Sequence, residues 1–270
     1  MIGASVVSVQ LGAAIAASLF DRVGAPGTVL LRQGFAAAVL LAIARPRLSG
    51  RDPKDWLVVC AFGLVLATMN VCFYEAVDRL PLGVAVTIEL FGPLGLAAGL
   101  SRTARELAYV ALAAVGVVLL GGATHHLDGI GVVFALCAAL GWATYILLSR
   151  HTGRRFDGVD GLALAMAVAT IAVAPLGIAT GGERLLEPGA LVTGLAVAML
   201  SAAIPFTLEL HALRMVGPRA FGVIMSTSPA VAATLGWLVL AEPLHGTQAM
   251  AICCVVLASA GAALAADVSR

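Results

Sequence analysis

Residues 80–100 read LPLGVAVTIELFGPLGLAAGL, a run that is long and apolar enough to cross a bilayer as one helix. Within it stand a carboxylate, Glu89, and four residues later a proline, Pro93. A charge at the centre of a membrane helix costs about 3 to 10 kcal/mol, and Pro93 has no N–H to donate to the carbonyl of Glu89. Both features are tolerated at that depth only against protein or water, which indicates a polar cavity at Glu89. A Pro-kinked packing helix, with a protonated Glu89 bonded to a neighbouring helix, is the alternative.

The composition extends this interpretation to the whole chain. Apolar residues make up 61% of the 270 residues and charged residues 11%, whereas soluble domains average about half apolar and a quarter charged. This balance predicts an all-α polytopic membrane protein. The net charge of +1 gives no indication of a nucleic-acid partner. The five cysteines lack metal-ligand spacing, and no hydrolase or nucleotide-binding motif is present, so we expect neither metal, cofactor nor enzyme activity.

Apolar runs of about 20 residues predict ten transmembrane helices. They cover residues 2–20, 27–44, 56–77, 81–101, 106–122, 129–149, 159–180, 189–213, 217–240 and 247–266. With a cytoplasmic N-terminus, twelve Lys and Arg residues fall on the inner side and three on the outer side. This is the positive-inside bias of short loops, so both termini are predicted to be cytoplasmic.

Ten helices divide into two groups of five. Because each group crosses the membrane an odd number of times, the second group has the opposite orientation in the membrane. We therefore predict an inverted repeat with one five-helix unit in residues 1–124 and the other in residues 125–270. Pro93 and Pro229, each in an apolar run, match at an offset of 136 residues. Inverted repeats with broken helices in matching positions are typical of transporters with a site near the midplane. Chance similarity between two helices rich in alanine and glycine is the alternative.

Few polar residues lie inside the predicted helices. Arg32 lies about 9 Å below the outer edge of its helix and keeps its charge in any ordinary environment. It either serves a site or extends its side chain to the interface. Glu209 follows Pro205 by one turn, and Pro205 frees the carbonyl of Ser201, so this segment also pairs a carboxylate with a broken helix.

Two further groups of residues have a packing interpretation as well as a functional one. Ser226 and Pro229 share one small, mildly polar face of the predicted helix 217–240, which suits either close helix packing or the lining of a narrow path. Trp142 and Tyr145 are three residues apart and could form an apolar wall beside a small ligand, although packing explains them equally well.

Five segments, in this order, resemble the EamA branch of the drug/metabolite transporter superfamily, and within it the threonine and homoserine exporters. They are GAPGTVLLRQG at 24–34, PLGVAVTIELFGPL at 81–94, ALGWATYILLS at 139–149, LSAAIPFTLELHALR at 200–214 and FGVIMSTSPAVAATLGWLVLAEPL at 221–244. The resemblance implies a ten-helix inverted-repeat carrier of the bacterial inner membrane that exports small amino acids or their analogues in exchange for protons. By position it also points to Gln10, Arg32, Glu89, Tyr145 and Glu209. Those exporters usually have an acidic residue before the proline of the ninth helix. Here that position is Ser228, so the ion count and the substrate stay open.

Together these features predict a secondary exporter of a small zwitterion that works by alternating access. We expect Glu89 and Glu209 to alternate between protonated and substrate-bound forms, and Arg32 to receive the carboxylate of the solute. Arg32 and Glu89 reach similar depths, about 9 and 12 Å, so we expect them to form an ion pair in the absence of substrate. The predicted partners are the solute, protons and the lipid bilayer, and the oligomeric state stays open. The alternatives are an organic-cation or drug exporter of the same fold and a non-transporting membrane scaffold.

Overall fold

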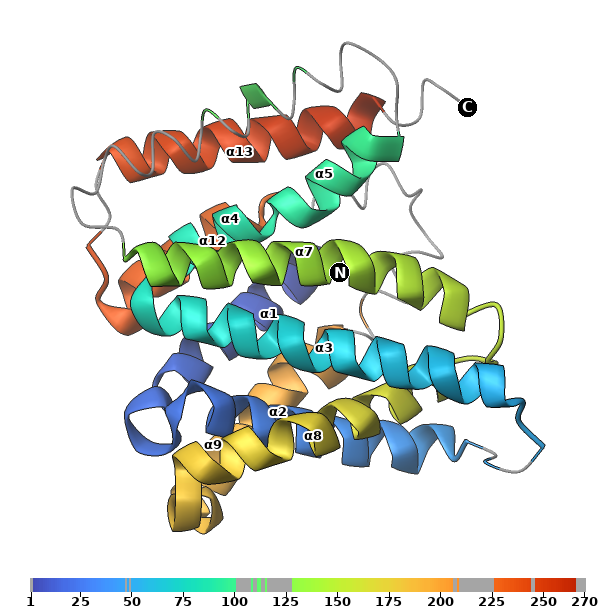
Figure 1. Ribbon diagram of the computed structural model, residues 1–270. Coiled ribbons are helices and arrows are strands. Elements are labelled where there is room, and N and C mark those ends of the chain that lie inside the picture. The colour runs from blue at the N-terminus through green and yellow to red at the C-terminus, as the bar shows by residue number, and fades with distance from the viewer. Residues whose placement is uncertain are drawn as a thin grey trace.

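The computed structural model describes residues 2–46, 48, 50–100, 108, 111–112, 115, 128–205, 208, 226–243 and 246–265. Over these residues the ordered elements are all helices, most of which run along a common direction (Figure 1). The chain opens with α1 (Ile2–Ala17), α2 (Phe20–Ala44) and α3 (Pro53–Arg79).

Helix α2 bends close to its start. Gly24 there has a φ of 73° and a ψ of 164°, a conformation that glycine adopts without the steric cost a side chain would add. Pro26 follows within the first regular turn. The bend explains why α2 begins seven residues before the predicted span 27–44, because the segment before Gly24 is a separate short helical piece.

The stretch that decides the fold is two helices rather than one. Helix α4 (Leu82–Glu89) ends at Glu89, and α5 (Phe91–Leu100) begins two residues later with Pro93 as its third residue. Leu90 forms a turn between them, and its N–H still donates to the Val86 carbonyl at 3.1 Å. The missing N–H of Pro93 therefore coincides with the break that the sequence predicts.

The second half of the chain continues with α7 (Gly129–Thr152), α8 (Asp160–Gly181), the 3₁₀ segment η1 (Gly182–Leu186), α9 (Pro188–Ala198), the π-helical turn η2 (Met199–Ala203), α12 (Ser228–Leu240) and α13 (Gly246–Ala265). Pro205 stands two residues after the end of η2, and Pro229 lies in the first turn of α12. All three prolines singled out from the sequence thus stand at a helix irregularity.

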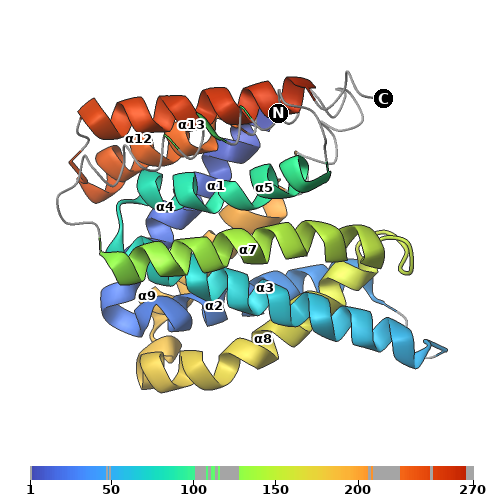
Figure 2. The same ribbon diagram turned by 45° about the horizontal axis from the view of Figure 1, so that its top comes forward.

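Helices from the two halves of the chain pack against each other throughout the described part. Helix α2 packs along α8, and α3 packs on both α7 and α8 (Figure 2). Helix α4 packs on α12 and α7, while α1 packs on α12 and on η2. One large hydrophobic core joins α1, α2, α3, α4, α7 and α8, and each half therefore depends on the other for its burial.

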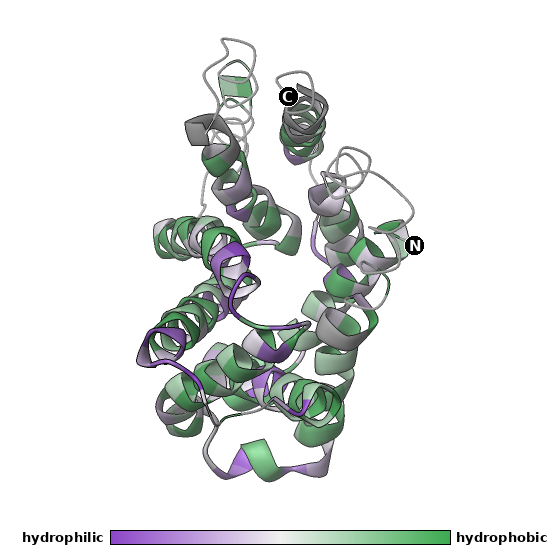
Figure 3. Cartoon of the chain, turned by 90° about the vertical axis from the view of Figure 1, so that its right-hand side faces the viewer, coloured by the Kyte–Doolittle hydropathy of each residue, from purple (hydrophilic) through white to green (hydrophobic). Residues whose placement is uncertain are grey.

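The surface of the bundle is largely apolar. Figure 3 shows hydrophobic residues along the helices and hydrophilic ones gathered mainly at their ends. Within the described part, four helical segments are long and apolar enough to cross a membrane alone: Phe20–Ala44, Pro53–Arg79, Gly129–Thr152 and Asp160–Leu186. Shorter apolar helices accompany them, α4 and α1 among them. The chain is an all-helical membrane protein.

Most predicted spans coincide with helices, although their edges shift by several residues. Much of the predicted span 106–122 lies outside the described residues, as do residues 209–225, which belong to the eighth and ninth spans. The count of ten and the inverted repeat therefore stay predictions.

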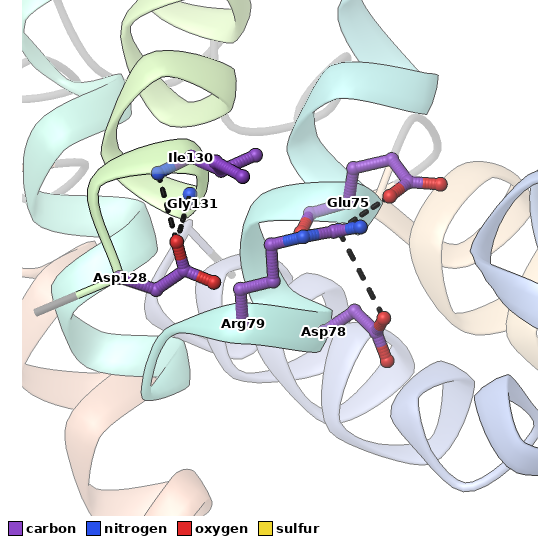
Figure 4. A network of polar contacts seen from close by, with 6 residues as sticks. All are labelled: Glu75, Asp78, Arg79, Asp128, Ile130 and Gly131. Atoms are coloured by element: carbon purple, nitrogen blue, oxygen red, sulfur yellow. Dashed lines mark hydrogen bonds and ion pairs between the residues drawn. The ribbon is translucent and has the colours of Figure 1, made fainter.

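Charged groups cluster at one end of α3 (Figure 4). Arg79 bonds to Glu75, and its guanidinium lies 3.9 Å from Asp78. Asp128 caps α7 in the same region by accepting the Ile130 N–H at 2.8 Å. This end of the bundle is thus held by polar contacts from both halves.

A second charged cluster lies at the opposite end of α3. Arg155 donates to Asp55 at 2.8 Å, and Arg51 lies 3.7 Å from Asp160. The guanidinium of Arg51 also covers the Phe156 ring at 4.5 Å. Polar networks therefore mark both ends of the bundle, as expected where helices leave the apolar phase of a membrane.

Candidate functional site

A cavity of about 170 Å³ lies within the bundle. Helices of both halves line it: α1, α2, α3 and α4 from the first half, and α7, η2 and α12 from the second. Its polar lining residues are Gln10, Arg32, Asn70, Glu89, Ser201 and Ser228. Its apolar lining residues are Val6, Val9, Ala13, Met69, Phe73, Tyr74, Val86 and Trp142.

Arg32 supplies the positive charge of the cavity. Its Nε donates to the Ser201 hydroxyl at 2.7 Å, and Nη1 donates to the Asn70 side-chain oxygen. Its guanidinium carbon lies 5.7 Å from the centre of the Tyr74 ring, within the range of a cation–π contact. Two neutral acceptors therefore orient the guanidinium.

Asn70 and Ser201 are functional candidates that the sequence analysis missed. Each is itself anchored to a backbone carbonyl: Asn70 donates to Leu66 at 2.8 Å and Ser201 to Val197 at 2.6 Å. Ser201 lies in the π-helical turn η2, a kind of distortion that is frequent at functional sites. Asn70 is the only asparagine in the chain and stands inside an apolar run, a signal that could have identified it.

Glu89 supplies the carboxylate of the cavity as the last residue of α4. The structure does not form the predicted ion pair between Glu89 and Arg32, both of which are described. Arg32 instead bonds to Asn70 and Ser201, because α3 and η2 pack directly on α2 and bring neutral acceptors to the guanidinium. A cation and an anion thus line one cavity without neutralising each other through a direct contact.

The remaining predicted residues divide between the cavity and its surroundings. Gln10 and Ser228 line the cavity, and both are buried. Ser226 is also buried but is not among the described lining residues. Trp142 lines the cavity, whereas the Tyr145 ring packs against Phe62 of α3 at 5.4 Å between ring centres. Glu209 lies outside the described residues.

The arrangement suits the binding of a small solute that carries both signs of charge. A buried charge is stable only when it is paired and hydrogen-bonded, so a zwitterion needs one fixed cation and one anion. Arg32 and Glu89 provide them, and the apolar lining accommodates a short side chain. Within the described ranges, no group of three or more His, Cys, Asp or Glu residues could hold a metal ion.

Comparison with known proteins gives a consistent assignment. A model of the EamA-like transporter family matches residues 129–264. The chain is 38% identical over 260 residues to the threonine/homoserine exporter RhtA of Salmonella typhimurium (strain LT2), a match that covers 95% of this chain and 88% of the relative. It is 36% identical over 263 residues to the protein of the same name from Escherichia coli (strain K12), covering 96% of this chain and 89% of that one.

The fold is also similar to that of a solved crystal structure. The TM-score is 0.65, the alignment covers 100% of this chain and 97% of the other, and the identity is 21%. At that identity the likeness concerns the fold alone. The sequence matches go further, because relatives of more than one third identity align over nearly the whole chain. The chain therefore belongs to the EamA-like transporter family, a family of membrane transporters and not of enzymes.

Proposed function

We propose that this protein is a secondary active transporter that exports a small amino acid or a related metabolite by alternating access. The observation that carries the proposal is the cavity in which Arg32 and Glu89, far apart in the sequence, line one space within an apolar bundle. The two relatives reported above are named threonine/homoserine exporters, which supports an amino acid as the solute.

The size of the cavity supports the same class of solute. An apolar cavity of about 150 Å³ is known to hold benzene, and threonine or homoserine has about eight non-hydrogen atoms. The cavity of about 170 Å³ matches a molecule of this size.

We propose that the cavity lies between two inverted five-helix units, residues 1–124 and 125–270. The packing pattern supports this division when α1, α2, α3 and α4 are matched with α7, α8, α9 and α12. The contact of α1 with α12 then corresponds to that of α7 with α4, and the contact of α3 with α8 to that of α9 with α2. Under the same matching, the α2–α8 contact and the α4–α12 contact each map onto themselves. Contacts across a pseudo-two-fold axis behave in this way.

In the proposed orientation both termini face the cytoplasm of a bacterium and the carrier lies in its inner membrane. The positive-inside bias of the loops supports this orientation. The charged cluster with Arg51 and Arg155 then lies on the inner side, and the cluster with Glu75 and Arg79 lies on the outer side.

We propose proton antiport as the source of energy, with Glu89 as the coupling group and Glu209 as a second carboxylate. Glu89 lines the cavity at a helix break, where it can exchange a proton for the ammonium group of the solute. No nucleotide-binding motif occurs in the sequence, which favours an ion gradient over ATP.

A carrier of organic cations is the second candidate. The aromatic lining, Phe73, Tyr74 and Trp142, together with a carboxylate suits a quaternary amine. Arg32 in the same cavity repels such a cation, so we favour the amino acid. A scaffold without transport activity is disfavoured by membership of a transporter family.

Growth protection tests the proposal in cells. Bacteria that express the wild type are expected to survive toxic concentrations of threonine or homoserine better than cells with an empty vector, because export lowers the internal level. Cells that express Glu89→Gln at the same membrane level are expected to lose this protection, whereas Glu75→Gln at the outer cluster should retain it. Protection against quaternary amines but not amino acids would support the second candidate instead.

A further inference from the structure

Gln10 is the one polar residue of the cavity with a buried oxygen that lacks a partner among the described residues. The residue is 6% exposed, and its Oε1 has no hydrogen-bond partner in the described part of the chain. Leaving a buried acceptor unpaired is costly, so such groups call for an explanation. Because Gln10 lines the cavity beside Arg32 and Glu89, a bound solute is in position to supply the missing donor.

Gln33 shows that an unpaired amide oxygen alone is not enough for this argument. It is 1% exposed and its Oε1 also lacks a partner among the described residues. Its amide nitrogen, however, donates to the Leu66 carbonyl at 3.3 Å, and Gln33 is not among the lining residues of the cavity. The combination of an unpaired oxygen and a cavity wall distinguishes Gln10 from Gln33.

The rotation of α1 that turns Gln10 to the cavity is fixed by two contacts with η2. The Ser8 hydroxyl donates to the Leu200 carbonyl at 2.7 Å. A Cβ on Gly12 would lie 3.2 Å from that of Ser201, so the two backbones approach closely there. Val6, Gln10 and Ala13, at positions i, i+4 and i+7, consequently share the face that lines the cavity.

Besides the neutral residues Asn70, Ser201 and Ser228, the cavity thus holds a cation in Arg32, a carboxyl group in Glu89 and, in Gln10, an acceptor that no described residue pairs. We infer that Gln10 is a specificity-determining residue whose Oε1 accepts a hydrogen bond from a hydroxyl group on the side chain of the transported amino acid. The inference rests on the proposed function, in which Arg32 receives the carboxylate and Glu89 the ammonium group. The hydroxyl is the remaining donor of a hydroxy amino acid, and Gln10 Oε1 is an acceptor that no described residue pairs.

The selectivity follows from the hydrogen bond to Gln10 that a solute without the hydroxyl cannot form. An analogue without the hydroxyl fills the cavity and excludes water but leaves Oε1 unpaired. Sites built to hydrogen-bond a solute group discriminate strongly against analogues that lack it. For one neutral hydrogen bond we expect a preference of about ten- to a hundredfold.

The test compares homoserine with 2-aminobutyrate, which has the same amino-acid groups and carbon chain but no hydroxyl. Dissociation constants come from the rise in melting temperature of the purified full-length protein in detergent with increasing solute. The wild type is expected to bind homoserine about ten- to a hundredfold more tightly than 2-aminobutyrate. Gln10→Met, which keeps the length of the side chain without the amide, is expected to bring this ratio to within about threefold of one.

Gln33→Met is the matched control, because it removes a buried amide of the same kind away from the cavity. It is expected to keep the wild-type ratio. Equal binding of the two solutes by the wild type overturns the inference without the need for any variant. A preserved ratio in Gln10→Met, or in Gln10→Leu if the Met variant does not fold, also overturns it. If the wild type binds neither solute, the proposed function fails and the inference with it.

Discussion

At the scale of single residues, the way Arg32 is held is the main finding of the site. Asn70 and Ser201 satisfy two of its donors without adding negative charge. A carboxylate partner would have neutralised the guanidinium, whereas these neutral acceptors fix its direction and leave its charge for the solute. The planar fork can then receive a carboxylate through two parallel hydrogen bonds.

The first prediction concerns Arg32→Lys. Lysine keeps the charge but cannot bond to Asn70 and Ser201 while also gripping a carboxylate with two donors. We expect binding of threonine to weaken by about tenfold or more, and binding of its decarboxylated amine to weaken much less. The melting-temperature assay with each solute measures both effects.

Arg79→Lys is the control for this substitution, because Arg79 pairs with Glu75 at the end of α3 and does not line the cavity. It is expected to leave both affinities as in the wild type. Equal weakening of threonine and the amine in Arg32→Lys, or no weakening of either, would show that Arg32 has a structural role.

The sequence predicted several cavity residues because charged groups and prolines are expensive inside membrane helices. Arg32 and Glu89 stand out for that reason, and the structure brings them to one cavity. Asn70 and Ser201 are neutral and cost less free energy inside a membrane helix, so the sequence analysis did not distinguish them as cavity residues. The predicted ion pair between Arg32 and Glu89 was wrong, because the depth of a residue along its helix does not show which neighbouring helix supplies its hydrogen-bond partner.

At the scale of helices, the contact between α5 and α7 depends on a glycine. A Cβ on Gly92 would overlap the Ala139 carbonyl oxygen of α7, and that backbone atom cannot rotate away. Gly95, one turn later on the same helix, has no atom of the described residues within 4 Å of such a Cβ. The packing therefore excludes a side chain at Gly92 and leaves room for one at Gly95.

The second prediction follows from this contrast. Gly92→Ala is expected to lower stability by about 1 to 3 kcal/mol through overpacking, seen as a lower melting temperature in detergent. Gly95→Ala is expected to be neutral or slightly stabilising, because alanine is the better helix former. Equal melting temperatures of the two variants would mean that α5 and α7 are farther apart than in the structure.

Another contact between elements joins the start of α4 to the segment after α12. Glu242 accepts the Leu82 N–H at 3.0 and 3.1 Å through its two carboxylate oxygens. Nothing local in the sequence shows that the partner of this glutamate lies 160 residues away. Burial raises the pKa of Glu242 above its ordinary value of 4.5, while the Leu82 N–H opposes the shift.

The third prediction uses the sign of this pKa shift. A carboxyl with a raised pKa holds its proton more tightly in the folded protein, so stability falls as pH rises above 4.5. The melting temperature of the wild type relative to Glu242→Gln is therefore expected to decline from acidic to neutral pH. Glu242→Ala, which removes the acceptor of the Leu82 N–H, is expected to melt below Glu242→Gln at every pH. A relative melting temperature that rises with pH contradicts this account.

At the scale of the whole molecule, composition predicted an all-helical membrane protein, because 11% of the residues are charged against about a quarter in soluble domains. Helix positions followed from the apolar runs. The pairing of α2 with α8 and of α3 with α7 could not be predicted. Nearly every helix is apolar all round, so periodicity does not show which face meets which partner.

The fourth prediction is topological and tests the inverted repeat. Reporters fused after Arg51 or Arg154 are expected to read as cytoplasmic, and reporters fused after His126 or Gly182 as external, because the positive loops stay inside. Arg51 and Arg154 lie in different halves, so their shared cytoplasmic signal tests the arrangement of both. Reversed signals at either pair contradict the five-plus-five arrangement.

The most direct test of the account is counterflow with the purified protein in proteoliposomes. Vesicles filled with unlabelled threonine are expected to accumulate external labelled threonine transiently, and an acid interior is expected to increase the uptake when protons are exchanged for the amino acid. Protein-free vesicles serve as the control. Exchange of quaternary amines without any exchange of threonine or homoserine, or no exchange at all by folded protein, would contradict the central claim that this cavity carries a small amino acid.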